Sequence, residues 1–467
     1  MITSRTGISC LSYLGGQKCL SYKTLLMTAG KRIVLTTFGS YGDIHPYMAI
    51  ATELRARGHQ ALIATSELYR EKMQTAGLDF FPVRPHIPPP QEQDATMMER
   101  VMNPRSGSGF LLNEMLFPFV RDGYGDLLQA INGADLLLTH PISLAGPLVA
   151  QKTGIPWVSS VLAPASFLSA YDFPVPPFWA WLRHMQIFGP RFVTAFFGQA
   201  KKYYRNKPYE EFRRELGLPD RGNPVFEGQH SPTLILALFS ALFAAPQPDW
   251  PPQTRVTGFA FYDGRNELGM PAALTKFLDE GSPPIVFTLG SSAVWVARDF
   301  YRESIAAAKL LNRRAVLLIG DQRNQPQDSL PADIIAVDYA PFESLLARAC
   351  AMVHHGGVGT TSQGLRAGIP TLIVPFAFDQ PDNAAHAARL GGSRTLPRAK
   401  YRAVRVASEL DILLTKPEHA TNARETGKLL RKENGVGVAA DLIEQVLKGD
   451  NSLTARRAED AVYAACN

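Results

Sequence analysis

Short apolar runs alternate with longer amphipathic stretches along most of the chain. The run KRIVLTTF, residues 31–38, is rich in β-branched side chains and ends at Gly39. PYMAIATELRARGH follows as a predicted helix, with Pro46 in its first turn and Gly58 at its end. QALIAT, residues 60–65, is the next predicted strand. Strand, helix and strand in this order predict a βαβ unit, and therefore a parallel sheet.

The same pattern recurs twice further along the chain. GADLLLTH and IPWVSSVLAP are predicted strands on either side of the predicted helix SLAGPLVAQKTG. Much later, SPPIVFTLGSSA repeats the strand and glycine turn of the first unit, and it leads into the predicted helix RDFYRESIAAAKLLNRR and the predicted strand AVLLIG. Uniformly apolar strands of this kind are typical of parallel sheets covered on both faces. The sequence thus predicts two α/β domains.

Changes in composition suggest the domain boundaries. Residues 246–271 are rich in proline and lack periodicity, which predicts an interdomain linker. We therefore expect an N-terminal domain over 30–245, a C-terminal domain over 272–435, and a final helix and tail over 436–467. Residues 1–29 show no periodicity and no signal-peptide pattern, so they are interpreted as a disordered extension or a mis-assigned start that precedes Met27.

Residues 165–205 differ from both domains because they are dense in Phe, Trp and Tyr and are broken by proline. Three interpretations stay open: a core-packing insertion, an apolar acceptor pocket, or a membrane-surface patch with a basic end.

Composition narrows the class of partner. Hydrophobic residues make up 46% of the chain and charged residues 19%, and the net charge is +6. This mild charge without a dense basic stripe argues against nucleic-acid binding. LILALFSALFAA, residues 234–245, is too short to span a bilayer and is interpreted as a buried strand and its exit. The four cysteines form no CxxC pair, which favours a cytoplasmic protein, with peripheral contact at the inner membrane face left open.

The strongest motif is MVHHGGVGTTSQGL, where a buried strand runs through two histidines and three glycines into a helix. Glycines let backbone approach a phosphate closely, and the free N–H groups of a helix start favour anions. His355, Thr360 and Thr361 add further donors. The motif lacks the Lys of a Walker A loop and the last Gly of GxGxxG. A zinc site is disfavoured because adjacent histidines on a strand point apart.

This stretch, together with GIP, VPF and DQPDNA downstream, resembles the donor signature of the family-1 nucleotide-sugar glycosyltransferases. The resemblance extends over about residues 31–445, and FGSYGDIHPYMAIATELRARGH also fits its place in that family. Within the family, LFAAPQPDWPPQTRVTGFAFYDG is most similar to the branch of bacterial rhamnosyltransferases, followed by the sterol glucosyltransferases. The resemblance implies a GT-B fold, in which two Rossmann-like domains have parallel sheets facing across a cleft.

The resemblance also implies roles for particular residues. His355 would contact the pyrophosphate with His354 behind it, the glycine turn would complete the cradle, and Asp379 with Gln380 would hold the sugar hydroxyls. An N-cap role for Asp379 is the structural alternative. The donor-site residues implied are Ser291, Ser292, Tyr339, Ala340, His354, His355, Gly356, Gly357, Val358, Gly359, Thr360, Thr361, Asp379 and Gln380. Gln363 occupies the place where plant members carry a ribose-binding Glu, which leaves UDP against dTDP open.

Many family members carry a histidine base after the first strand, but the matching position here is Asp43. An inverting transfer needs a base on the acceptor hydroxyl, and a carboxylate can serve. The candidates for catalysis are Asp43, His140 at the end of DLLLTH, and His45. Asp43 could instead cap the helix at Pro46, and His140 could be a satisfied strand-end residue, a partner of Asp43, or the base itself. His45 is interpreted as a surface or acceptor-cleft residue.

We therefore predict an inverting glycosyltransferase that moves a hexose or deoxyhexose from a UDP- or dTDP-sugar to a hydroxyl of a lipophilic acceptor, such as a lipid, sterol or polyketide. No Asp-x-Asp occurs in the chain, so no metal and no further cofactor is expected. The alternatives are a nucleotide-sugar 2-epimerase of the same fold and a non-catalytic nucleotide-sugar-binding subunit. The aromatic segment 165–205 disfavours the epimerase, and the presence of Asp43, Asp379 and Gln380 disfavours the binding subunit.

Overall fold

The computed structural model describes residues 30–88, 95–177, 180–264 and 269–449. The chain from Lys31 onward forms one compact unit. The predictions about residues 1–29, about the tail beyond 449 and about Cys10, Cys19 and Cys466 lie outside the described residues.

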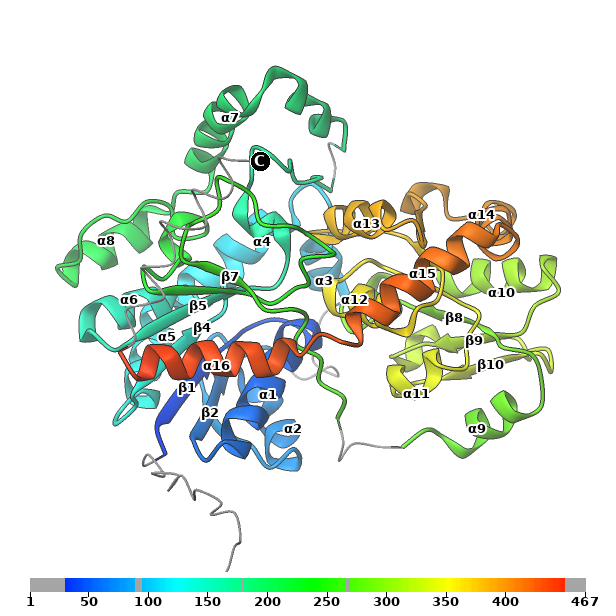
Figure 1. Cartoon of the computed structure of the whole chain (residues 1–467), viewed down its shortest axis with the longest axis horizontal. Coiled ribbons are helices and arrows are strands. Elements are labelled where there is room, and N and C mark those ends of the chain that lie inside the picture. The colour runs from blue at the N-terminus through cyan, green and yellow to red at the C-terminus, as the bar shows by residue number, and fades with distance from the viewer. Residues whose placement is uncertain (1–29, 89–94, 178–179, 265–268, 450–467) are drawn as a thin grey trace, which may run out of the picture. The chain divides into compact units, whose positions relative to one another are not determined.

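The first sheet has seven parallel strands in the order β3-β2-β1-β4-β5-β6-β7 (Figure 1). Its strands are β1 (Arg32–Thr36), β2 (Gln60–Thr65), β3 (Asp79–Pro82), β4 (Leu136–Thr139), β5 (Trp157–Val161), β6 (Leu234–Ala237) and β7 (Thr254–Val256). β1 pairs with β2 on one side and with β4 on the other. The order reverses at β1, so the carboxyl ends of β1 and β4 meet at the point where such sheets place their ligands.

Helices cover both faces of this sheet. Ile33 and Leu35 of β1 pack towards α1 (Tyr41–Ala56), α2 (Arg70–Thr75) and α16 (Gly435–Leu447), whereas Val34 packs towards α5 (Val120–Ala130) and α6 (Ala145–Thr153). The alternation follows from the pleat, which sends successive side chains to opposite faces. The shorter helices α3 (Ala95–Val101), α4 (Gly107–Phe110) and α8 (Lys207–Glu215) also belong to this half of the chain.

The second sheet has six parallel strands in the order β10-β9-β8-β11-β12-β13. Its strands are β8 (Ile285–Thr288), β9 (Ala315–Leu318), β10 (Ile334–Val337), β11 (Ala351–His354), β12 (Thr371–Ile373) and β13 (Ser393–Thr395). Its helices are α9 (Ala272–Asp279), α10 (Phe300–Leu310), α11 (Phe342–Leu346), α12 (Val358–Ala367), α13 (Gln380–Arg389), α14 (Ala403–Thr415) and α15 (Pro417–Leu430). The two parallel-sheet Rossmann-like domains predicted from the sequence are confirmed.

Two local features differ from the expectation, and a third, the packing of the final helix, was not predicted. The first helix begins at Tyr41 with Ser40 as its N-cap, so Pro46 lies inside the helix and Asp43 lies in its first turn. Asp43 is therefore not the N-cap residue, but its carboxylate still caps this helix from the third helical position by accepting the Ser40 backbone N–H. β7 lies within residues 246–271, the range expected for the linker, because it pairs with β6 and extends the first sheet. The final helix α16 packs on α1, far from it in the sequence, where Ile443 joins the first apolar core.

Residues 165–205 divide between core and surface. Phe173, Leu182, Val193 and Phe197 form a small apolar cluster of their own. This cluster joins a 3₁₀ segment, Ala180–Phe188, to the helix α7 (Pro190–Tyr203). The core-packing interpretation therefore holds for part of the segment, while other apolar side chains of it are exposed.

Candidate functional site

Asp43 is held at the start of α1 by its own turn. Its Oδ2 accepts hydrogen bonds from the Ser40 backbone N–H at 2.8 Å and from the Ser40 hydroxyl at 3.1 Å. Gly39 precedes this turn with a φ of +129°, and a Cβ at Gly39 would lie 2.3 Å from Asp43 Oδ2. Only glycine leaves room for the carboxylate in this position. The Asp43 side chain remains 31% exposed, so it is fixed in direction yet accessible.

His140 follows β4 and lies beside Asp43. Its Nε2 is 3.4 Å from Asp43 Oδ1, and its side chain is 4% exposed. The Tyr47 ring packs edge-on against the imidazole with 5.8 Å between the ring centroids. The structure thus brings together two of the three residues that the sequence suggested for catalysis.

The hydrogen bonds of His140 define its neutral tautomer. Its Nδ1 accepts a hydrogen bond from the Ile142 backbone N–H at 3.3 Å. The ring proton of the neutral imidazole therefore lies on Nε2, which faces the Asp43 carboxylate. In this arrangement His140 is a donor towards Asp43, and Asp43 is the partner with free acceptor capacity.

His45 lies elsewhere, although it is only two residues from Asp43. Successive helical residues are turned by about 100°, so the two side chains leave α1 in nearly opposite directions. The His45 ring packs between those of Tyr41 and Tyr262, at centroid distances of 5.3 and 5.2 Å. Burial, aided by the charge of Lys72, lowers the pKa of His45 to about 3. The structure thus separates His45 from the Asp43–His140 pair.

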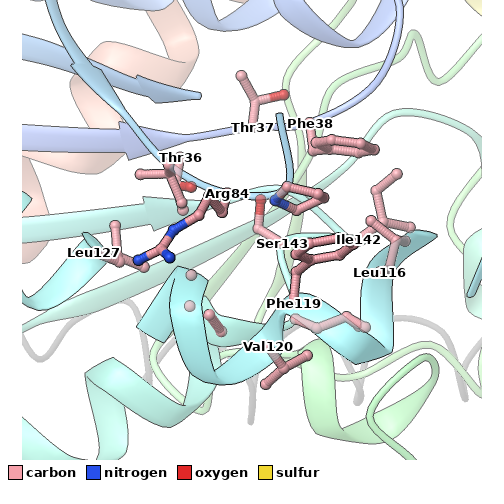
Figure 2. Close-up of a pocket in the computed structure, with 16 residues that line it drawn as sticks. Thr36, Thr37, Phe38, Arg84, Leu116, Phe119, Val120, Leu127, Ile142 and Ser143 are labelled. Carbon is pink, nitrogen blue, oxygen red and sulfur yellow. The ribbon is translucent and has the colours of Figure 1, made fainter. Parts of the chain in front are cut away.

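A cavity opens at the carboxyl end of β1, lined by Thr36 to Phe38 and by Ile142, which follows His140 by two residues (Figure 2). It has a volume of about 40 Å³. Phe38, Phe119 and Ile142 gather on one side of it, and Arg84 lies on the other side near Leu127. Thr37 lines the cavity and contacts the Asp43 turn, since its hydroxyl donates to the Asp43 carbonyl at 3.0 Å. The sequence analysis missed this mainly apolar wall, because it is assembled from four separate segments of the chain.

The two histidines of the glycine motif are buried where β11 meets α12. His354 Nδ1 accepts from the Gly356 N–H at 3.1 Å, which fixes the turn behind the motif. The His355 ring lies between two glycines: a Cβ at Gly290 would meet its Cε1 at 2.5 Å, and one at Gly357 would meet its Nε2 at 2.5 Å. Burial lowers the pKa of His354 to about 3 and that of His355 to about 4. Both rings are therefore neutral at pH 7, and His355 Nδ1 is buried without a hydrogen-bond partner among the described residues.

The rest of the cradle is a helix start with few spare side-chain donors. Gly357 is the N-cap of α12, and Val358 begins the helix. The Thr361 hydroxyl donates to the Gly357 carbonyl at 3.0 Å, so in this structure it bonds to the start of its own helix. Thr360 is buried, and Gly359 approaches the first helix: a Cβ there would lie 3.7 Å from Gly42 Cα. The cradle and the Asp43 turn are thus neighbours.

Asp379 and Gln380 open α13 after a strained residue. Phe378 has a φ of +55°, a conformation that non-glycine residues adopt rarely and that is frequent at functional sites. Asp379 occupies the N-cap position but makes no capping bond; its Oδ2 accepts from Asn383 Nδ2 at 2.8 Å. Asn383 also donates to the Gly356 carbonyl at 3.0 Å, which ties this turn to the cradle. Gln380 Oε1 accepts from the backbone N–H groups of Phe376 and Ala377, so only its amide N–H₂ is left for a ligand.

Asp379 is electrostatically linked to Asp43. Burial raises its pKa to about 6. The negative charge of Asp43 adds to the rise, and the hydrogen bond from Asn383 opposes it. Asp43 and Asp379 are therefore close enough to influence each other, although they lie more than 300 positions apart in the sequence.

The remaining predicted donor residues lie in two loops. Ser291 and Ser292 follow β8 after Gly290, beside the His355 ring, and both are half-buried. Tyr339 is 49% exposed in the loop before α11, whereas Ala340 is 2% exposed and packs in an apolar core. The Ala340 side chain therefore faces away from any ligand, and only its backbone could border a base.

A buried charge cluster, which the sequence analysis did not identify, ties α13 to residues 169–175. Asp382 Oδ1 accepts from the Val175 N–H at 2.9 Å. Arg389 donates to both carboxylate oxygens of Asp172, at 3.0 and 2.7 Å. His386 Nε2 lies 3.5 Å from Asp382 and 3.6 Å from Asp172. The helix that begins with Asp379 is thereby fixed to the start of the aromatic segment.

Comparisons with known proteins agree with this arrangement. Residues 33–108 match the glycosyltransferase family 28 N-terminal domain, and residues 302–443 match the erythromycin biosynthesis protein CIII-like C-terminal domain. The chain is 33% identical over 428 residues to O-mycaminosyltylonolide 6-deoxyallosyltransferase of Streptomyces fradiae, covering 89% of this chain and 97% of that protein. The chain is a GT-B glycosyltransferase.

More distant relatives of this glycosyltransferase confirm the likeness expected from the sequence. It is 29% identical to a sterol 3-beta-glucosyltransferase of Leptosphaeria maculans over 91% of its own length, but it spans only 29% of that longer protein. The solved structure of spinosyn forosaminyltransferase SpnP superposes with a TM-score of 0.66 at 19% identity, covering 90% of this chain and 99% of that one. VinC in complex with dTDP superposes with a TM-score of 0.63 at 20% identity, covering 89% and 99%.

Proposed function

We propose that this glycosyltransferase moves a hexose or deoxyhexose, with inversion, from a dTDP- or UDP-sugar to a hydroxyl of a lipophilic small molecule. The observation that carries the proposal is the Asp43–His140 pair, with an Nε2–Oδ1 distance of 3.4 Å, beside a glycine cradle on a helix start. A base and an anion site in adjacent turns are the two parts that such a transfer needs.

Asp43 is the proposed base. Its carboxylate takes the proton of the acceptor hydroxyl as the acceptor oxygen forms its bond to the sugar C1. The bond between C1 and the diphosphate oxygen breaks on the opposite face, which inverts the configuration. His140 is a positioning residue in this scheme, because its Nε2–H faces Asp43 Oδ1 and orients the carboxylate.

The departing diphosphate carries the developing negative charge. We infer that the backbone N–H groups of Gly357 to Thr361, at the start of α12, receive it together with His355. The unpartnered Nδ1 of His355 and the lack of space for a Cβ at Gly290 and Gly357 support this assignment. Ser291 and Ser292 would flank the same phosphates, and His354 would hold the turn through Gly356.

The sugar would lie against Asp379 and Gln380. Asp379 offers a carboxylate oxygen that is not used by Asn383, and Gln380 offers its amide N–H₂. Tyr339 would border the base. Thymidine diphosphate is bound in the structures of VinC and of the spinosyn rhamnosyltransferase SpnG, which favours dTDP over UDP for this chain.

The acceptor would enter beside His140 through the cavity between β1, α5 and α6. Its lining is mainly apolar, which suits a lipophilic molecule, and its volume of about 40 Å³ accommodates only the part nearest the reacting hydroxyl. The Streptomyces fradiae relative acts on a mycaminosylated tylonolide and the fungal relatives act on sterols, as their names state. A polyketide or sterol hydroxyl is therefore the proposed acceptor class.

The test uses the full-length protein with radiolabelled dTDP- and UDP-sugars and a panel of macrolides and sterols. A glycosylated acceptor and one equivalent of nucleoside diphosphate, with an inverted anomeric configuration by NMR, are the expected products. Conversion of the donor to its 2-epimer without any acceptor would favour the epimerase alternative instead. Nucleotide binding without turnover on any acceptor, under conditions where a known transferase is active, would favour the binding subunit.

A further inference from the structure

The aromatic segment exposes a compact apolar tip. Ile187 is 79% exposed, Phe188 is 63% exposed and Phe192 is 48% exposed. Ile187 and Phe188 end the 3₁₀ segment Ala180–Phe188, Phe192 lies in the first turn of α7, and the Phe188 and Phe192 rings are 5.2 Å apart. Three large apolar side chains in six positions form a patch, in contrast to the single exposed apolar residues that any surface carries. We call Ile187, Phe188 and Phe192 the apolar tip.

The apolar tip is adjacent to a buried apolar cluster. Val193 and Phe197 of α7 are buried against Phe173 and Leu182, so the inward face of the helix is already filled. Arg191, Phe192 and Lys202 of α7 are exposed; Arg191 and Lys202 lie on the same side of the helix, and Phe192 is turned from them by about 80–100°. The exposed side of the helix thus carries Phe192 and one cation at its start and further cations in its last turn.

The charge around the tip has a single sign. Residues 173–209 contain six Lys or Arg side chains, at positions 183, 191, 201, 202, 205 and 207, and no Asp or Glu. Lys201 pairs with Glu227, and Arg205 pairs with Glu210. Arg191, Lys202 and Lys207 are exposed, and no ion pair is recorded for them within the described residues. Arg191 therefore lies beside the apolar tip, Lys202 lies at the other end of α7, and Lys207 begins α8.

We propose that the apolar tip and its cations dock on an anionic lipid bilayer. Apolar side chains can enter the boundary between headgroups and acyl chains while Lys and Arg meet the anionic headgroups, which is the design of interfacial helices. The proposed contact is peripheral, and in the described ranges no helix is long and apolar enough to cross a bilayer. A second copy of the chain fits this surface less well, because it would set the same cations against each other.

The test is vesicle co-sedimentation with the full-length protein. Vesicles contain phosphatidylcholine alone, or phosphatidylcholine with about 30 mol% phosphatidylglycerol. Binding to the anionic vesicles, and its weakening at high salt, are expected. The double variant Ile187→Glu, Phe188→Glu should no longer bind anionic vesicles. The double variant Arg191→Glu, Lys202→Glu should bind anionic vesicles more weakly, by at least about fivefold for each residue changed.

Matched variants separate docking from general changes in surface or stability. Leu310 and Val404 are 61% and 75% exposed on the second domain, so Leu310→Glu with Val404→Glu changes the same kind of surface elsewhere. Lys309→Glu with Lys432→Glu makes the same change in net charge away from the tip. Both control variants should bind vesicles like the wild type, and all variants should melt within a few degrees of it.

Two results would overturn the proposal. One is wild-type protein that stays unbound to anionic vesicles, or that binds them equally after the tip is changed. The other is a dimer of the wild type, measured by light scattering, that becomes monomeric in the Ile187→Glu, Phe188→Glu variant. A second copy of the chain, and not a bilayer, would then cover the apolar tip. Neither readout depends on enzymatic activity, so it stands apart from a failure of the proposed transfer reaction.

Discussion

Nε2 of His140 lies 3.4 Å from Oδ1 of Asp43, with the imidazole buried and the carboxylate partly exposed. Two neighbouring parallel strands create this pair, because β1 and β4 are hydrogen-bonded and both residues follow the carboxyl ends of their strands. The imidazole proton faces the carboxylate, and the carboxylate faces solvent. The proposed base, Asp43, is therefore the residue that an acceptor can reach, and the proposed orienting group, His140, is buried behind it.

Asp43→Asn should lower kcat by about 10²–10⁴-fold, because an amide cannot accept the acceptor proton. Donor affinity should change little, since Asp43 belongs to the acceptor side. Initial rates with saturating donor and acceptor measure the effect, and nucleotide-induced thermal shift checks that the donor site is intact. Near-normal turnover in this variant would remove Asp43 as the base.

His140→Ala should also lower kcat, but by less than Asp43→Asn, because it removes the orienting contact and not the base. The double variant should be no slower than Asp43→Asn alone, since residues acting as one unit are not additive. Tyr47→Phe serves as the control, because it keeps the ring against His140 and loses only the hydroxyl contact with Ser160. A silent His140→Ala would end the pairing hypothesis.

Gly290→Ala should abolish nucleotide binding. A Cβ at this position would lie 2.5 Å from His355 Cε1, and the backbone φ of +62° disfavours any side chain. Isothermal titration with dTDP and UDP measures the loss. Gly154→Ala is the matched control, since Gly154 has a φ of +72° but open space around it. That variant should lose about 1 kcal/mol of stability and keep its nucleotide affinity.

The raised pKa of Asp379 predicts that the proposed sugar binding depends on pH. Burial raises its folded-state pKa to about 6, above the unfolded value of 3.8. Between these values the folded state binds more protons than the unfolded state, so this group makes stability fall as pH rises from about 4 to 6. Activity should rise over the upper part of the same window, because the ionised carboxylate is the acceptor for sugar hydroxyls.

Asp379→Asn tests both consequences. It should raise the melting temperature at pH 7.5 and leave it nearly unchanged at pH 4, because the variant carries no buried charge at either pH. The donor KM should rise, since an amide replaces the carboxylate. Thermal melts at three pH values and donor titrations measure these effects. A lower melting temperature at pH 7.5 would contradict the proposed cost of ionising Asp379.

Asp382→Ala should destabilise the protein by about 1–3 kcal/mol, because it leaves the buried Val175 N–H without its acceptor. Limited proteolysis should then cut more readily within residues 165–205. The control is Glu343→Gln, which changes an exposed pair with Arg366 and should shift stability by less than about 1 kcal/mol. Equal protease resistance in both variants would show that the cluster does not hold the segment.

Activity should persist in EDTA. In the proposed scheme the diphosphate charge is met by the start of α12 and by His355, without a metal ion. The measurement compares initial rates after dialysis against EDTA with rates after addition of Mg²⁺ or Mn²⁺. A rate lost in EDTA and restored by either ion would overturn this part of the scheme.

Several site features were predictable because they depend on local sequence. The apolar strand β11 and the three glycines that follow it before a helix predict a phosphate-type turn from local sequence alone. Other features were not predictable locally. His45 could be separated from catalysis only once the helix was known to begin at Tyr41, since this start fixes Asp43 and His45 on different faces. The roles of Thr361 and Gln380 depended on hydrogen bonds to a turn that the sequence does not show.

By itself, the sequence determined the family, the two parallel sheets and the two glycine turns, because apolar periodicity and glycine spacing are local properties of the chain. Only the tertiary structure decided which distant residues meet. The strand order placed β4 beside β1 and so His140 beside Asp43. The packing of the second domain brought Asp379 within electrostatic reach of Asp43, and the last helix returned to cover α1. Such contacts arise from the joint burial of apolar faces, which no single segment encodes.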